Sequence, residues 1–208
     1  AVDSELRVRF TSPHPKDFPD ALLQLMAERP NLCNNVHLPA QSGSTEVLRR
    51  MRRGYSREAF LDLAAHIRRT IPGVALSTDI ITGFCGETEA DHEDTVSLMR
   101  AVSFEQAFMF AYSMRDRTHA YHRMADDVPE ADKQRRLRDV IDAFRDEATK
   151  RNQAEVGTRH LVLIEGPSKR SRPDAPELVG RVDNNKRCVV RDVPTAATLG
   201  GAGRGSLG

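Results

Sequence analysis

The segment VALSTDIITGFCGETEAD, residues 74–91, decides the fold of this chain. Its first half is apolar at odd and even positions alike, which is typical of a parallel strand buried on both faces. Two glycines then interrupt the segment, and Thr88 with Asp91 three residues later forms the pattern of a capping box at a helix start. The segment therefore predicts a strand, a tight turn and a helix, which is the repeating unit of a parallel α/β fold.

The same succession of strand and helix recurs on both sides of this segment. Short β-prone runs precede apolar patterns with helical spacing, and serines or threonines stand at the predicted helix starts. We expect strands at 7–11, 35–38, 74–81 and 107–112, and helices at 20–29, 45–52, 56–71, 88–102 and 129–152. Four strands that alternate with helices in this way predict parallel β/α units.

From residue 160 onward the pattern changes to short strands separated by polar turns. The runs HLVLIEG, ELVGRVD and RCVVRD indicate a small all-β module, and the first two are separated by the basic, proline-rich loop PSKRSRPDAP. The final stretch is low in complexity, and we expect it to be disordered. We predict three parts with the boundaries 1–155, 156–191 and 192–208.

The composition excludes some classes of protein. Hydrophobic residues make up 39% of the 208, which is enough for a core, and 31 Lys and Arg balance 30 Asp and Glu for a formal net charge of +1. The global charge therefore gives no sign of nucleic-acid binding, although arginines can cluster locally. No apolar run approaches the length that spans a bilayer, and the start lacks both a methionine and a signal-peptide pattern. We expect an interior piece of a longer protein that has no membrane partner.

The three cysteines do not predict a metal site. Cys33, Cys85 and Cys188 are far apart, and no two of them have a metal-ligand spacing. An odd number of cysteines without a secretion signal indicates free thiols in a reducing compartment.

Polar residues follow the predicted strands, at the carboxyl ends where parallel α/β folds bind ligands. Gln41 and Ser42 follow the second strand, Asp79 lies within the third, and Gly83 lies in the turn beyond it. A buried carboxylate needs a partner, and for Asp79 this is either the hydroxyls of a sugar or a salt bridge or backbone amides. Gly83 allows either close approach of the backbone to a ligand or simply a tight turn.

Basic residues stand at two further candidate sites. Arg53 lies twelve residues beyond Gln41 at the end of a predicted helix, where it either grips a carboxylate with its two-pronged guanidinium or is solvated. Lys169, Arg170 and Arg172 lie on the proline-rich loop, which we expect to be flexible, and Arg181 follows. These four cations either contact RNA phosphates or form a solvated face.

Three separate motifs carry a resemblance to a known family. The segments HLPAQSGSTEVLRRMRRGY (37–55), STDIITGFCGETEAD (77–91) and AYSMRDRTHAY (111–121) resemble the radical S-adenosylmethionine (SAM) methylthiotransferases of the MiaB type, especially the mitochondrial tRNA enzymes of animals. The resemblance implies an α/β fold, namely the C-terminal part of a partial TIM-like radical SAM barrel followed by a truncated all-β TRAM module that grips tRNA. It also implies methylthiolation of N6-isopentenyladenosine beside the anticodon.

The resemblance further implies the cofactors and partners. S-adenosyl-L-methionine would contact Gln41 and Asp79 through its ribose and Arg53 through its carboxylate, with Ser42 and Gly83 beside it. The full-length enzyme would carry two [4Fe-4S] clusters, whose ligands are absent from this chain because it has no C-x-x-x-C-x-x-C motif. The anticodon stem-loop of tRNA, a possible regulatory protein partner and a mitochondrial location are implied as well.

The missing cysteine motif keeps other functions open. One alternative is a truncated, non-catalytic product that binds RNA or a protein. Another is a plain β/α-barrel enzyme without radical chemistry, although this leaves the ordered motifs unexplained.

Overall fold

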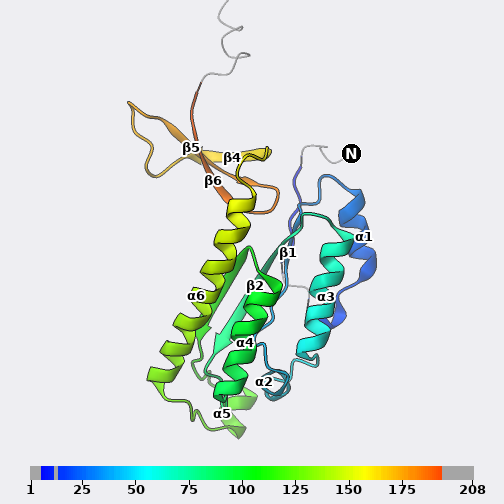
Figure 1. Ribbon diagram of the computed structural model, residues 1–208, viewed down its shortest axis with the longest axis vertical. Coiled ribbons are helices and arrows are strands. Elements are labelled where there is room, and N and C mark those ends of the chain that lie inside the picture. Colours follow the sequence, from blue (N-terminus) through cyan, green and yellow to red (C-terminus); the bar gives the residue numbers. More distant parts are fainter. Residues whose placement is uncertain (1–5, 12–13, 194–208) are drawn as a thin grey trace, which may run out of the picture. The chain divides into compact units, whose positions relative to one another are not determined.

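The computed structural model describes residues 6–11 and 14–193 (Figure 1). The chain divides into two compact units, residues 1–158 and residues 159–208.

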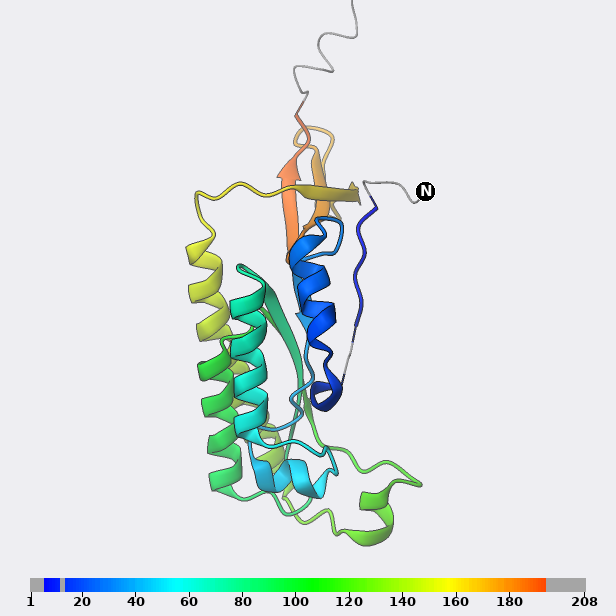
Figure 2. The same cartoon turned by 90° about the vertical axis from the view of Figure 1, so that its right-hand side faces the viewer.

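The first unit contains a three-stranded parallel sheet. Its strands are β1 (Asn35–His37), β2 (Ala75–Thr82) and β3 (Gln106–Ala111), in the order β1-β2-β3. The helices are α1 (Asp20–Glu28), α2 (Thr45–Arg50), α3 (Arg57–Thr70), α4 (Glu89–Val102), α5 (His119–Arg123) and α6 (Glu130–Ala154), with a 3-10 turn η1 (Pro15–Asp17). Helices α3, α4 and α6 lie together on one face of the sheet (Figures 1 and 2). The predicted mixed α/β fold is thus confirmed in this unit.

The alternation of side chains along β2 explains why the helices cover only one face. Leu76, Thr78, Ile80 and Thr82 are no more than 1% exposed and point into the layer between sheet and helices. On the other face, Asp79 is only partly buried, and the neighbouring strand β3 exposes Phe108 by 53%. The expectation that this strand is buried on both faces is met along its first half, where Ala75 and Ser77 are 1% and 3% exposed, but not at Asp79 and Ile81, which are only partly buried.

The predicted helix starts are confirmed by their hydrogen bonds. The side chains of Ser44 and Ser56 accept bonds from backbone N–H groups in the first turns of α2 and α3. Thr88 and Asp91 form the complete capping box of α4. Short local patterns thus define where these three helices begin.

The predicted strand at 7–11 is wrong. Among the described residues of this segment, only Val8 pairs, in a single parallel bridge with Leu32. The bridge consists of a bond from Val8 N to Asn31 O (2.9 Å) and one from Cys33 N to Val8 O (3.0 Å). Because the facing segment is the short connection after α1, a longer ladder cannot form, and the sheet has three strands rather than four.

The second unit is an antiparallel sheet. Its strands are β4 (Val162–Pro167), β5 (Glu177–Val182) and β6 (Arg187–Arg191), in the order β4-β5-β6. They coincide with the three runs that the sequence predicts. The final residues 194–208 lie outside the described part, so the disorder expected for 192–208 stays a prediction.

The loop between β4 and β5 is held by several hydrogen bonds. Ser168 N bonds to Glu177 O at 2.9 Å, and Glu177 N bonds to the Ser171 hydroxyl at 2.9 Å. A small bridge also joins Arg172 to Ala175. These bonds close the base of the loop onto the strand that follows, and the flexibility expected for the loop stays a prediction.

Candidate functional site

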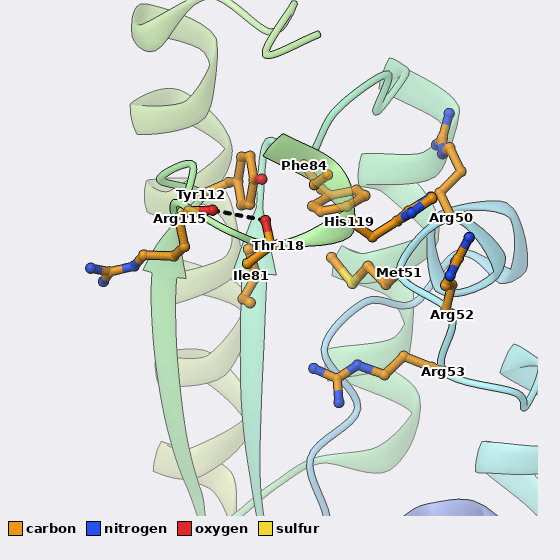
Figure 3. Close-up of a pocket in the computed structure, with 11 residues that line it drawn as sticks. Arg50, Met51, Arg52, Arg53, Ile81, Phe84, Tyr112, Arg115, Thr118 and His119 are labelled. Atoms are coloured by element: carbon orange, nitrogen blue, oxygen red, sulfur yellow. Dashed lines mark hydrogen bonds between the residues drawn. The ribbon is translucent and has the colours of Figure 1, made fainter. Parts of the chain in front are cut away.

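A pocket of about 200 Å³ opens at the carboxyl ends of β2 and β3 (Figure 3). Met51, at the end of α2, and Ile81, at the end of β2, contribute apolar surface. Phe84 and Tyr112 add two aromatic rings, whose centroids are 4.8 Å apart in an edge-to-face arrangement. Arginines lie around this apolar lining, so the pocket suits a ligand that combines a flat apolar group with an anionic one.

Arg53 is the partly buried arginine of this pocket whose charge has no partner among the described residues. Arg52 and Arg115 also make no ion pair there, but both are exposed. Figure 3 shows the guanidinium of Arg53 turned toward the side of Ile81. The Arg53 guanidinium makes no hydrogen bond or ion pair with any residue that the structure describes, and its buried Nε has no partner. Arg50 also has an unpartnered Nε, but its terminal nitrogens donate to Gly86 O at 2.7 Å and to the Asp91 carboxylate at 3.1 Å. A buried donor without a partner is costly, which makes an anionic ligand the natural partner of Arg53.

The turn after α2 places Arg53 in the pocket. Arg52 has a left-handed φ of 59°, and Arg53 N then donates to Leu48 O at 3.0 Å, so the chain reverses at once. The Tyr55 hydroxyl fastens this turn by donating to the carbonyls of Pro39 and Ala40, each at 3.1 Å. Burial raises the pKa of Tyr55 to about 12 in spite of the nearby Arg53 charge, so this hydroxyl stays a donor.

Gln41, which follows β1, lies beside Asp79 of β2. Gln41 N donates to Asp79 O at 2.8 Å, and Ile81 N donates to Gln41 O at 2.9 Å. Gln41 has a φ of 65° and is 8% exposed. Its side-chain amide makes no hydrogen bond within the described part of the chain.

The partner of Asp79 is a histidine that the sequence reasoning missed. The Asp79 side chain is 32% exposed, and its Oδ2 lies 3.3 Å from His37 Nε2. Of the two kinds of partner that the sequence left open, the structure contains a protein contact, while the other carboxylate oxygen has no partner among the described residues. A sugar hydroxyl can therefore still bind there.

Ser42 shapes the loop that leads to α2. It is 2% exposed, and its hydroxyl lies 3.3 Å from Thr95 Oγ1 and accepts a bond from Ser44 N at 3.1 Å. At Gly43 next to it, an added Cβ would lie 2.4 Å from Asp94 O. These small residues are needed because the loop packs directly against the backbone of α4.

A glycine is needed at position 83 for a comparable structural reason. Its φ is +75°, and an added Cβ would lie 2.3 Å from Lys133 Cγ. Gly83 N donates to Glu87 Oε1 at 2.8 Å, and Arg136 donates to the same oxygen at 3.2 Å. Burial raises the pKa of Glu87, which these bonds oppose. The turn after β2 is therefore packed tightly against α6.

The apolar side of the pocket was also missed from the sequence. Burial raises the pKa of Tyr112 to about 12, as does its neighbour Cys85. Lys133 is only 4% exposed, with its Nζ 2.6 Å from Asp126 Oδ1 and 5.5 Å from the centre of the Tyr112 ring. The aromatic residue directly after a strand end was the available signal. To use this signal, one must know that α5 folds over the Tyr112 ring.

The predicted RNA-binding cations lie in the second unit. Lys169 and Arg170 are exposed, and Arg172 lies 3.5 Å from Asp174. Together these three residues, Lys169, Arg170 and Arg172, are called the basic loop below. Arg181 is partly neutralised, since its Nε lies 3.2 Å from Glu165 Oε1. The basic loop therefore offers more available charge than Arg181.

The described residues do not fit an iron–sulfur cluster. They contain no group of three His, Cys, Asp or Glu side chains that could hold a metal ion. Cys33 and Cys85 are both buried, and Cys188 lies in the second unit. Across residues 6–11 and 14–193, no helix is long and apolar enough to cross a membrane.

Comparisons with known proteins agree with this geometry. Residues 2–99 match the Radical SAM superfamily. The chain is 61% identical, over 92% of its length, to the mitochondrial tRNA methylthiotransferase CDK5RAP1 of Homo sapiens, of which it covers 31%. It is 45% identical, over 98% of its length, to the tRNA-2-methylthio-N(6)-dimethylallyladenosine synthase of Chlorobium luteolum, of which it covers 48%.

A solved structure supports the fold. Coproporphyrinogen III oxidase (HemN) from Escherichia coli, a radical SAM enzyme, matches 64% of this chain and 31% of its own, with a TM-score of 0.53 and 20% identity. The chain spans about a third of the length of the first of the curated relatives that it matches. Residues 2–99 therefore carry a radical SAM domain, and over more than nine tenths of its length the chain is similar to tRNA methylthiotransferases.

Proposed function

We propose that this chain is part of a tRNA methylthiotransferase that converts N6-isopentenyladenosine beside the anticodon into its 2-methylthio derivative. The identity to relatives named for this reaction extends over more than nine tenths of the chain. It favours the enzyme over a non-catalytic binding module. Two relatives that are 61% and 60% identical are named mitochondrial, and we propose the same location here. A regulatory protein partner stays a prediction.

The observation that carries this proposal is the unpaired Arg53 in the pocket at the strand ends. Its guanidinium would grip the carboxylate of S-adenosyl-L-methionine, and its orphaned Nε fits such an anion. Gln41 and the open oxygen of Asp79 would hold the ribose on the adjacent strand ends, while Ser42 and Gly83 keep the backbone close. The bound cofactor, reduced by one electron from a centre outside the described residues, would supply the radical chemistry that activates the base.

The iron–sulfur clusters do not fit the residues described here, and we derive no step from them. We propose that residues outside this chain hold both [4Fe-4S] clusters. The sheet β1-β2-β3 would then be part of a partial radical SAM barrel formed by residues 1–155.

We further propose that the antiparallel sheet is part of a TRAM module, residues 156–191, that binds the anticodon stem-loop of tRNA. The exposed cations of the basic loop support this, with Arg181 as a weaker contributor because Glu165 already neutralises it. Phosphates would be the partners of these side chains.

The cofactor site is tested in the full-length protein that contains this segment. Arg53→Lys and Asp79→Asn should each weaken binding of S-adenosylhomocysteine about ten- to a hundred-fold, since a charge-assisted hydrogen bond contributes roughly 1.5–3 kcal/mol. Isothermal titration calorimetry measures this. Arg49→Lys is the matched control, because Arg49 is 71% exposed and, among the residues that the structure describes, pairs only with Glu46. Unchanged affinity in both site variants would refute the assignment.

A further inference from the structure

A histidine and a serine stand beside Asp79 in an arrangement that the proposed function does not use. His37 on β1 is in register with Ser77 on β2, and Asp79 follows two residues later on the same face of that strand. His37 Nδ1 lies 3.0 Å from Ser77 Oγ, and His37 Nε2 lies 3.3 Å from Asp79 Oδ2. Both ring nitrogens therefore have a partner.

The imidazole ring is also held from a third side. Phe108 on β3 is in register with Asp79, and its ring meets the His37 ring edge-on, with 6.1 Å between the centroids. His37 is 8% exposed and Ser77 is 3% exposed. The ring therefore has little freedom to turn, because its contacts come from two neighbouring strands.

The chemistry of the two contacts sets the direction of the hydrogen bonds. An ionised carboxylate only accepts, so the hydrogen must lie on His37 Nε2. In the neutral ring Nδ1 is then an acceptor, and the Ser77 hydroxyl donates to it. The result is a chain of donors from Ser77 through His37 that ends at Asp79 Oδ2. Asp79 Oδ1 makes no hydrogen bond with the described residues.

We propose that His37 is a positioning residue that fixes the Asp79 carboxylate, with Ser77 fixing the tautomer of the ring. The inference rests on the proposed role of Asp79 in binding a ribose. A short carboxylate that is one third exposed rotates among several rotamers unless a partner holds it. His37 occupies Oδ2 and thereby presents Oδ1 to the hydroxyls of a nucleoside. A fixed acceptor binds more tightly because less freedom is lost on binding.

The test uses the full-length protein and two nucleoside probes, S-adenosylhomocysteine and its analogue without the 2′ and 3′ hydroxyls. His37→Phe keeps a ring beside Phe108 but removes the donor to Asp79. It should weaken S-adenosylhomocysteine binding by roughly ten-fold and leave binding of the deoxy analogue unchanged. His37→Gln, whose amide N–H can replace Nε2, should restore most of the affinity.

Two further variants separate positioning from stability. Ser77→Ala removes the donor to Nδ1 and should weaken S-adenosylhomocysteine binding less than His37→Phe does. His66→Phe is the matched control, since it breaks a similar contact of 2.6 Å with Asp20 on the outer helices α1 and α3. It should leave the affinity for both probes unchanged.

The outcomes separate this inference from the proposed function. If Asp79→Asn weakens S-adenosylhomocysteine binding but His37→Phe does not, the positioning role is wrong and the proposed site stands. Equal loss with both probes, or no rescue by His37→Gln, also overturns it, because the ring would then act only through packing. A full-length protein that binds neither probe overturns the proposed function and this inference together.

Discussion

Replacing Asp91 should separate the loop before α2 from helix α4. The Asp91 carboxylate accepts bonds from the Ser44 hydroxyl at 2.5 Å, from Arg50 Nη2 at 3.1 Å and from Thr88 N at 2.9 Å. The side chain is 12% exposed and that of Arg50 is 24% exposed. Asp91 is therefore a largely buried acceptor that joins three segments, including the helix that leads to Arg53.

The structure sets the size of the effect. Losing a helix cap costs about 1 kcal/mol, and losing a hydrogen bond between charged groups costs roughly 1.5–3 kcal/mol. Asp91→Ala also leaves Arg50 partly buried without its carboxylate, which is the situation that makes breaking a buried ion pair costly. We expect the free energy of unfolding to fall by about 3 kcal/mol.

Urea denaturation followed by circular dichroism measures this change. The matched control is Asp94→Ala on the same helix, because Asp94 is exposed and its side chain makes no ion pair with the described residues. A loss below about 1 kcal/mol for Asp91→Ala, the size of a helix cap alone, would refute the reasoning.

The same prediction has a pH dependence. Burial alone would raise the pKa of Asp91, but hydrogen bonds from Ser44, Thr88 and Arg50 outweigh it and hold the pKa below its usual value. A carboxyl whose folded-state pKa is lowered contributes stability that is present above its unfolded pKa and is lost as the pH falls. The difference between wild type and Asp91→Ala should therefore shrink below about pH 4, the unfolded value of an aspartate.

Two further predictions concern the turn after β2 and the basic loop. Gly83→Ala should lower the free energy of unfolding by more than Gly73→Ala, measured by the same denaturation. Both glycines have φ near +75°, so both variants carry the backbone strain of roughly 1–2 kcal/mol, but only at Gly83 would the Cβ meet Lys133; nothing lies within 4 Å at Gly73. Equal losses would contradict the packing argument. Changing the basic loop to three alanines in the full-length protein should weaken binding of an anticodon stem-loop and flatten its salt dependence, since fewer counterions are released. Filter binding at low and high salt measures this, and an unchanged affinity at both would leave the loop as a solvated linker.

The parts of the fold that were predictable are those set by local sequence. Ser44, Ser56 and Thr88 each start a helix because the capping bond joins residues three apart, and such a spacing can be seen in one short segment. The strand expected at 7–11 failed for the opposite reason. A strand needs a partner of matching length, and the chain offers Val8 only a single bridge, to Leu32. Pairing of that kind is not visible in the strand's own residues.

The same distinction applies to the site. Asp79 was identified as a candidate from its position in the second half of a strand, and Arg53 from its position at the end of a helix, twelve residues beyond Gln41. His37 was missed because its contact with Asp79 depends on the register between β1 and β2, which places His37 opposite Ser77. Alternation along β2 would place Ser77 and Asp79 on one face, but only the register shows which residue of β1 joins them.

Hydrogen bonding within the protein separates the predicted site residues into two groups. The Ser42 hydroxyl and the Gly83 backbone are satisfied by neighbouring residues, so their small size is explained by packing against α4 and α6. The Arg53 guanidinium, the Gln41 amide and one oxygen of Asp79 have no partner in the described part of the chain. Stability alone gives no reason for a half-buried arginine whose donors stay unpaired, because such a group is costly in the folded protein. These three polar groups at the ends of adjacent strands therefore point to a ligand, whereas Ser42 and Gly83 hold the backbone that surrounds it.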